Sequence, residues 1–282
     1  MLPADSHVHS EFSWDTGGPA SAAVGTMERT CARAVRIGLP TVIFTEHLDI
    51  TGWTVAPEDF AEHLRGLINP HGHMQPPLLD LDSYLTRIDR CRKLFPDLQI
   101  LTGVEFGQPH LDGAAARAAV DFSALDRVNG SLHTLPFRGS RCEPVTVFRE
   151  LDDPDEVIWL YLAEVPVMVE GGDFDVYTHL DYAVRAWPVD DHGPFDPRPF
   201  EDGFRQAMRA IAGSGRPLEM NTAGRLRPWI PQWWAEEGGR AVTFGSDDHG
   251  DDMLAANFPE TTALLEHLGF RPGRRPADYW TR

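Results

Sequence analysis

The amino-acid sequence predicts an α/β protein whose parallel strands curl into a distorted (β/α)7 barrel. Short β-branched, apolar runs alternate along the chain with segments of helical periodicity. Several of these runs end in a histidine, a glutamate or an aspartate. Because the carboxyl ends of all strands meet at one mouth of a parallel barrel, these polar ends are expected to lie close together. Two long loops are expected to extend over them.

The composition limits the classes of partner that the chain can have. Its 282 residues are 42% hydrophobic, and apolar runs recur along the whole length, so residues 1–282 are expected to form one domain. A net charge of -18 gives no support for nucleic-acid binding, which needs Lys and Arg to replace phosphate counterions. The sequence begins without a signal peptide, and no apolar run approaches the roughly 18 residues of a membrane span. Together with three widely spaced cysteines, these features predict a cytoplasmic protein without a membrane partner.

The opening strand, residues 5–9, contains a His-x-His pair. Side chains two residues apart in a strand leave the same face, so the imidazoles of His7 and His9 are expected to point together while Val8 points the other way. Such a pair can chelate one metal ion, although an isolated His-x-His is more often just exposed.

The remaining elements follow from two periodicities. Apolar side chains at spacings of three and four predict helices, and short β-branched runs predict buried parallel strands. Helices are expected at 21–37, 81–95, 114–120, 153–169, 200–212, 229–238 and 258–269, and strands at 39–45, 98–107, 129–133, 174–182, 217–222 and 241–250. Residues 51–82 and 187–199 lack periodicity and predict the two long loops, and 138–142 predicts a basic turn.

Polar residues at the strand ends are the main functional signal. The series contains His7, His9, His47, Glu105, His133, His179, Asp247 and His249. A single buried histidine is more often satisfied by a backbone carbonyl, but packing does not require a polar residue at every strand end. Carboxylates clustered in this way would repel one another without cations between them. Imidazole and carboxylate donors without thiolate suit zinc, manganese or iron.

These motifs resemble those of the PHP (polymerase and histidinol phosphatase) family, in particular its histidinol-phosphatase branch. The matching motifs are Asp5-Ser6-His7-Val8-His9, Thr45-Glu46-His47, Gly103-Val104-Glu105, Gly130-Ser131-Leu132-His133, Thr178-His179-Leu180-Asp181 and Gly245-Ser246-Asp247-Asp248-His249. The resemblance implies a seven-stranded barrel, three divalent metals (Zn, Mn or Fe) and metal ligation by the eight residues of the series. A ninth family ligand is often a histidine, and here that position is Asp15.

The same resemblance implies hydrolysis of a small phosphate monoester, most specifically L-histidinol phosphate in histidine biosynthesis. A hydroxide that bridges the metals is the expected nucleophile, and Asp247 is the candidate for orienting it or passing on its proton. Arg185, Arg225 and Arg227 follow strand ends and are candidates for gripping phosphate. Two alternatives stay open: a phosphoesterase for a sugar phosphate, nucleotide or cyclic phosphate, and a metal-binding barrel without catalytic activity.

Overall fold

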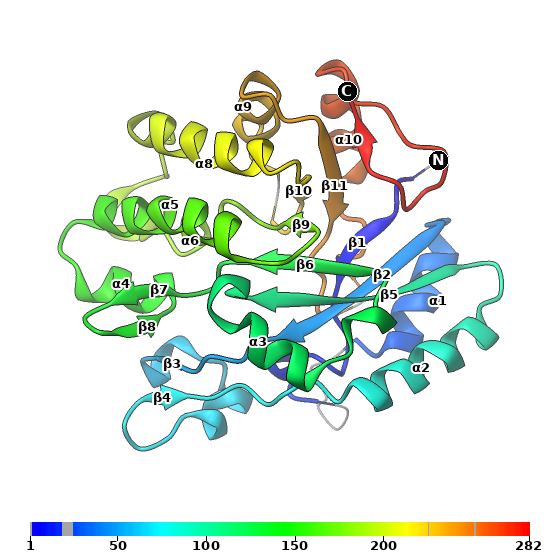
Figure 1. Ribbon diagram of the computed structural model, residues 1–282, viewed down its shortest axis with the longest axis horizontal. Coiled ribbons are helices and arrows are strands. Elements are labelled where there is room, and N and C mark those ends of the chain that lie inside the picture. The colour runs from blue at the N-terminus through cyan, green and yellow to red at the C-terminus, as the bar shows by residue number, and fades with distance from the viewer. Residues whose placement is uncertain (1, 19–24, 225, 251) are drawn as a thin grey trace.

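The chain folds around one strongly curled sheet (Figure 1). The structure is a computed structural model that describes residues 2–18, 25–224, 226–250 and 252–282. The strand order is β1-β2-β5-β6-β9-β10-β11-β12, and all neighbours pair in parallel except β11 and β12, which are antiparallel. An isolated parallel bridge joins Val8 to Asp248, so the sheet curls until β1 lies beside the end of β11. The predicted fold class, a distorted α/β barrel of seven parallel strands, is confirmed.

The strands of this sheet are short and mostly buried, as their runs of apolar residues require. β2 and β5 are the longest and pair over eight consecutive residues, from Thr41 with Gln99 to Leu48 with Phe106. The bounds are Asp5–Val8 (β1), Thr41–Leu48 (β2), Gln99–Gly107 (β5), Arg127–Ser131 (β6), Val176–Tyr177 (β9), Leu218–Asn221 (β10), Ala241–Gly245 (β11) and Trp280–Thr281 (β12).

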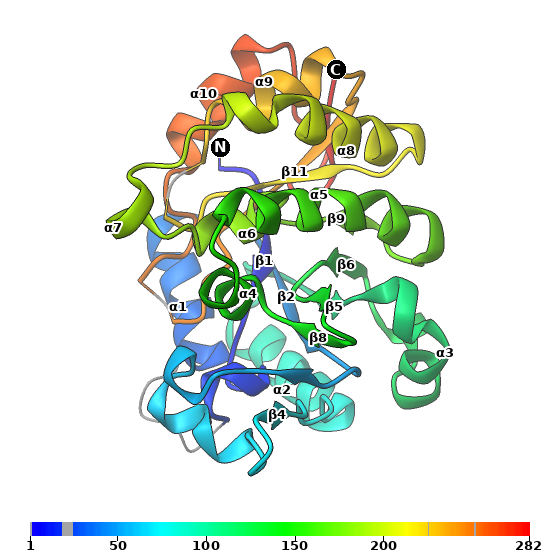
Figure 2. The same cartoon turned by 90° about the vertical axis from the view of Figure 1, so that its left-hand side faces the viewer.

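Helices surround the curled sheet on its outer face (Figures 1 and 2). The longer ones are Met27–Ile37 (α1), Leu81–Leu94 (α2), Pro109–Ala119 (α3), Pro154–Gly171 (α5), Glu201–Gly213 (α8), Trp229–Glu236 (α9) and Phe258–His267 (α10). Short helices are Pro144–Glu150 (α4), Tyr182–Arg185 (α6) and Val189–His192 (α7), with 3₁₀ turns at Trp14–Thr16 (η1), Pro57–Asp59 (η2), Glu62–Leu67 (η3), Phe122–Ala124 (η4) and Arg198–Phe200 (η5). Within the described ranges, no helix combines the length and the apolarity that crossing a membrane would need.

A second, smaller sheet lies on the side toward which β2, β5 and β6 point (Figure 1). Its order is β4-β3-β8-β7, with bounds Trp53–Thr54 (β3), His73–Met74 (β4), Leu135–Phe137 (β7) and Ser140–Cys142 (β8). Its apolar cluster contains Trp53, Val55, Phe60, Leu64 and Met74. We call this unit, residues 51–79 with 135–143, the cap. The predictions of a plain loop at 51–82 and a turn at 138–142 were therefore incomplete.

Element bounds also differ from several predictions, and the loop predicted at 187–199 contains the short helix α7. Three other differences involve α1, α3 and β9. Helix α1 begins at Met27, because the Thr26 side chain accepts a hydrogen bond from the Arg29 N–H and caps the helix there, and the predicted residues 21–24 lie outside the described ranges. Helix α3 begins at Pro109 rather than at 114, since proline is well suited to a first helical position. The strand predicted at 174–182 pairs only over β9, so the chain leaves the sheet before His179.

Candidate metal centre

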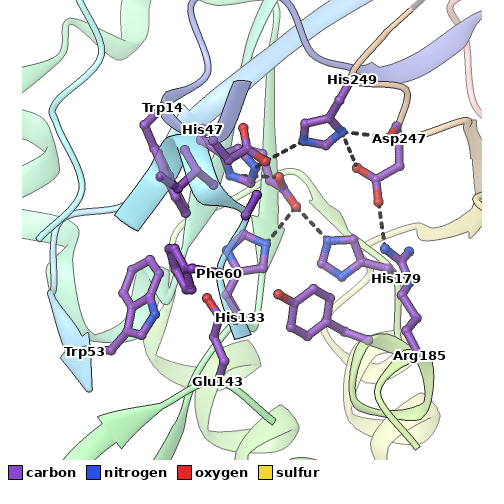
Figure 3. Close-up of a pocket in the computed structure, with 15 residues that line it drawn as sticks. Trp14, His47, Trp53, Phe60, His133, Glu143, His179, Arg185, Asp247 and His249 are labelled. Carbon is purple, nitrogen blue, oxygen red and sulfur yellow. Dashed lines mark hydrogen bonds and ion pairs between the residues drawn. The ribbon is translucent and has the colours of Figure 1, made fainter. Parts of the chain in front are cut away.

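The predicted ligand residues converge at the carboxyl ends of the parallel strands. Figure 3 shows five of them around the pocket: His47, His133, His179, Asp247 and His249. His7 lies in β1, His47 in β2 and Glu105 in β5. The others follow their strands closely: His9 after β1, His133 after β6, His179 after β9, and Asp247 and His249 after β11. The sequence pattern therefore located side chains that the fold brings together.

Donor atoms of these residues form four overlapping groups, each compact enough to surround a cation. Within each group, ligand atoms lie within 4.8 Å of one another. The groups are His9, His47 and His249; His7, His9 and Glu105; His7, His179 and Asp247; and His47, Glu105 and His133. Because the groups share His7, His9, His47 and Glu105, the geometry fits a multinuclear centre in which neighbouring cations have ligands in common.

Glu105 occupies the middle of this cluster. Its Oε1 lies 2.6 Å from His179 Nε2 and 3.0 Å from His133 Nε2. Its Oε2 lies 3.4 Å from the Nε2 atoms of both His7 and His9. A carboxylate that faces histidines on both oxygens is placed to bridge two cations.

Asp15 joins the cluster from η1. Its Oδ2 lies 2.8 Å from His249 Nε2 and 3.4 Å from His47 Nε2. Its other oxygen, Oδ1, is buried without a hydrogen-bond partner. The structure thus places this carboxylate within the cluster, and its role as the ninth ligand implied by the family resemblance stays a prediction.

The electrostatics of the cluster require positive charge next to the carboxylates. Burial opposes protonation of His7 and His47, but nearby carboxylates outweigh burial and hold both pKa values well above the usual value. For His9, burial and neighbouring histidines lower the pKa to about 3. Burial would raise the pKa of Glu105, yet the surrounding histidines keep it well below its usual range. Cations bound to the imidazoles can supply the same charge as these protons.

Several buried donor atoms also lack a hydrogen-bond partner, which supports metal binding. His47 Nδ1, His179 Nδ1 and His249 Nε2 are among these atoms, and the short approach of His249 Nε2 to Asp15 lacks hydrogen-bond geometry. Buried polar atoms without partners are rare in folded proteins. The donor set of imidazoles and carboxylates without thiolate therefore fits several divalent cations such as zinc, manganese or iron.

Three residues that the sequence analysis did not assign contact the predicted ligand residues from behind and fix their side chains. Glu219 Oε1 lies 2.7 Å from His7 Nδ1, and Asp49 Oδ1 lies 3.2 Å from His133 Nδ1. The Ser13 hydroxyl lies 2.8 Å from His9 Nδ1 and donates to Glu46. Acceptors of this kind orient metal-binding imidazoles and raise their basicity. Their signal in the sequence was their location beside, or in the strand next to, a predicted ligand.

The three predicted phosphate-binding arginines differ in position. Arg185 lines the cavity, and its Nη1 donates to Asp247 Oδ2 at 2.8 Å. Arg227 donates to Asp181 at 3.0 Å and is not one of the residues that line the cavity. Arg225 lies outside the described residues. Arg185 is thus the one of the three that the described structure places beside the cluster.

A pocket with a volume of about 240 Å³ opens onto the cluster. Figure 3 shows an aromatic wall from η1 and the cap on one side, and Arg185 and Asp247 on the other. The Glu143 side chain enters from the end of the hairpin β7–β8. Lining residues outside the metal cluster are Trp14, Trp53, Phe60, Ala61, Leu64, Glu143, Tyr182 and Arg185. The pocket therefore joins a metal-binding face, a guanidinium group and an apolar wall.

Comparison with known protein families identifies the architecture. The model of the PHP domain matches residues 5–223, which contain most of the cluster. The chain belongs to the PHP family. As a PHP-family protein with this buried cluster, it is a phosphoesterase-like, metal-binding barrel, and the sequence-based identification of the family is confirmed.

Individual PHP relatives are similar over nearly their whole length. The chain is 24% identical over 277 residues to the probable histidinol-phosphatase of Clostridium acetobutylicum, covering 95% of this chain and 94% of that protein. It is 25% identical over 276 residues to the Deinococcus radiodurans counterpart, with coverage of 95% and 94%. The crystal structure of histidinol phosphate phosphatase from Lactococcus lactis, which contains zinc, L-histidinol and phosphate, matches with a TM-score of 0.75 and 22% identity over 96% of this chain and 95% of that chain. That likeness shows the shared fold.

Proposed function

We propose that this PHP-family protein hydrolyses a phosphate monoester, most specifically L-histidinol phosphate to L-histidinol and phosphate. The observation that carries the proposal is the pocket in which Arg185 and the buried ligand cluster face the same space. The curated relatives of similar length are named as histidinol-phosphatases, and this favours the histidinol ester. We also propose that residues 1–282 act as one domain, because one apolar core extends from Val8 to Trp280.

The proposed ligands are the nine residues predicted from the sequence. They would hold up to three divalent cations, of which zinc, manganese and iron suit the donors. When bound, such cations would neutralise phosphate charge and make water a competent nucleophile near neutral pH. The ligands are His7, His9, Asp15, His47, Glu105, His133, His179, Asp247 and His249.

Arg185 and Asp247 have complementary proposed roles at the phosphate. Asp247 Oδ2 accepts hydrogen bonds from Arg185 Nη1 at 2.8 Å and from Asn221 Nδ2 at 3.3 Å. These contacts leave Oδ1 directed toward His7 and His9, 3.5 and 3.4 Å away. Through this oxygen Asp247 would orient the attacking water and accept its proton. The second guanidinium nitrogen of Arg185 would bind a phosphate oxygen, a charge-assisted contact.

The rest of the pocket suits a small organic group with a positive charge. Trp14, Trp53 and Phe60 form a continuous wall, with the Trp14 and Phe60 rings stacked at a centroid distance of 6.3 Å. The Glu143 carboxylate faces the same space. Aromatic faces and a carboxylate attract ammonium and imidazolium groups, which histidinol phosphate carries and a simple sugar phosphate lacks.

A substrate panel on protein of known metal content tests the proposal. L-histidinol phosphate, a sugar phosphate, a nucleotide and a cyclic phosphate are assayed with matched Zn²⁺ or Mn²⁺ loading. We expect the highest kcat/KM for histidinol phosphate, and Arg185→Ala should raise KM more than Arg227→Ala, whose side chain is held by Asp181. A higher kcat/KM for another ester would show that histidinol phosphate is not the preferred substrate. Full metal occupancy without any turnover would show that the protein is a metal-binding barrel without catalytic activity.

A further inference from the structure

The turn between β5 and α3 is strained and buried. Gln108 precedes Pro109 and has a φ of 51°, in the left-handed region. This conformation is unfavourable for a residue other than glycine, and such conformations persist where the surroundings impose them, often at functional sites. The exposed fraction of Gln108 is 1%. Its contacts identify what this turn holds in place.

We propose that Gln108 is a positioning residue for His133. The Gln108 side-chain Oε1 accepts the His133 backbone N–H at 3.1 Å, and its Nε2 donates to Thr134 Oγ1 at 2.8 Å. Its own backbone N–H donates to the Ser131 carbonyl at 2.9 Å. Gln108 thus forms hydrogen bonds with Ser131 on one side of Leu132 and with His133 and Thr134 on the other, in the segment at the end of β6. An amide side chain carries both the acceptor and the donor that these two contacts use.

The imidazole of His133 is fixed by a different residue, Asp49, whose carboxylate packs against Gly107 in the turn between β5 and α3. Asp49 Oδ1 lies 3.2 Å from His133 Nδ1, which directs Nε2 toward Glu105 at 3.0 Å. A Cβ added to Gly107 would lie 1.9 Å from Asp49 Oδ1, so only glycine leaves room for this carboxylate. The residue pair Gly107 and Gln108 therefore sets both the backbone and the ring of one ligand.

The same contacts extend from His133 to the cap. Arg141 in β8 donates through Nε to Thr134 Oγ1 at 3.2 Å, the oxygen that also receives Gln108. Arg141 Nη1 donates to Glu164 in α5 at 2.7 Å. The hairpin that leads to Glu143 is thus anchored on the residue after His133. Gln108 thus fixes the position of His133 relative to the base of the cap hairpin.

This inference rests on the proposed ligand role of His133, and its experiment measures metal binding directly. The variants are Gln108→Gly, which removes the side chain and relieves the backbone strain, and Gln108→Ala, which removes the side chain and keeps the strain. Gln108→Asn keeps an amide that is one methylene shorter. Gln99→Ala is the control, since Gln99 lies at the other end of β5 and accepts a hydrogen bond from Thr41 at 2.9 Å. Zn²⁺ and Mn²⁺ affinities are measured by chelator competition, with melting temperatures of the metal-free proteins and kcat and KM alongside.

We expect Gln108→Gly and Gln108→Ala to lose metal affinity equally, by roughly 10–100-fold, although their melting temperatures differ. Gln108→Asn should bind metal between these variants and the wild type, and Gln99→Ala should bind like the wild type. At saturating metal, kcat should recover while KM changes little. Unchanged affinity in both side-chain deletions, or a loss that follows melting temperature across all four variants, would overturn the inference. Metal binding without phosphatase activity in the wild type would instead overturn the proposed function alone.

Discussion

The proposed ligands include two groups that differ in how firmly they are held. The inner set, which comprises His7, His9, Glu105, His133 and His179, lies within or just after strands of the curled sheet and is almost fully buried. The rim pair, Asp15 and His249, lies on η1 and on the loop after β11, with side chains 23% and 36% exposed. Strand ends are fixed by sheet hydrogen bonds, whereas loop residues depend on their own contacts. The inner set should therefore hold metal more tightly than the rim pair.

Contacts behind the ligands show the same difference. In the inner set, the Nδ1 atoms of His7 and His133 face the carboxylates of Glu219 and Asp49. In the rim pair, His249 Nδ1 donates to the backbone carbonyl of Asp247 at 3.0 Å. A carboxylate partner increases the basicity of an imidazole ligand more than a neutral carbonyl does, because it carries a full negative charge. Both the position of the side chains and the charge of their partners thus favour tighter metal binding by the inner set.

The largest effect is expected for Glu105→Gln, at the centre of the inner set. The substitution keeps the shape of the side chain but removes the charge that faces His133 and His179. Loss or displacement of a metal ion removes several kcal/mol of charge stabilisation from the transition state. Because each ~1.4 kcal/mol of activation free energy changes the rate tenfold, kcat should fall by about 10³-fold. Elemental analysis and steady-state kinetics measure both changes. A variant with full metal content and normal turnover would show that Glu105 is not a bridging ligand.

A smaller loss is expected for Glu219→Gln, which acts through His7. The carboxylate lies 2.7 Å from His7 Nδ1, and loss of such a partner costs roughly 10–100-fold in metal affinity or activity. Chelator competition measures the affinity. Glu28→Gln is the matched control, because Glu28 pairs with Arg90 on the surface at 2.6 Å. Equal metal affinities in the two variants would argue that the inner set needs no carboxylate support.

Asp15→Asn tests the rim pair and should have a weaker effect. The amide keeps an oxygen near His249 but removes the charge, so we expect an affinity loss of about tenfold or less. The rate at which a chelator removes the first equivalent of metal should rise more than the rate for the rest. Loss of all metal at one common rate would mean that the rim and the inner set are a single unit.

The smallest effect is expected at Glu164 in α5, which accepts a hydrogen bond from Arg141 of the cap hairpin. A hydrogen bond from His110 and the contact with Arg141 lower the pKa of Glu164 against the effect of burial. A carboxylate with a lowered folded-state pKa stabilises the fold above its unfolded value of 4.5, and that stability disappears as pH falls through the folded-state value. Glu164→Gln should therefore lower the melting temperature at pH 7, and the difference from wild type should shrink toward pH 3. A difference that is constant with pH would exclude a charge contribution from Glu164.

The sequence was most informative where local pattern and tertiary position coincide. His47 and Glu105 each end an apolar strand, so their convergence follows from the parallel fold. Glu219 was missed as a partner of His7 because 212 positions separate them along the chain. Strands of two residues, such as β3 and β9, are too short to show alternation. β3 pairs with β8 through residues far apart in the sequence, Thr54 with Cys142. The cap could therefore not be predicted from periodicity.

By itself, the sequence determined the alternation of strands and helices and the polar residues at strand ends, because periodic burial and strand termination are local properties of the chain. Only the tertiary structure decided which side chain supports which ligand, since hydrogen bonds such as Gln108 to His133 join segments that meet after the sheet has curled. It also decided that Arg185 faces the cluster while Arg227 is held by Asp181. Both arginines follow a strand end, and only their distances to other residues in space distinguish them.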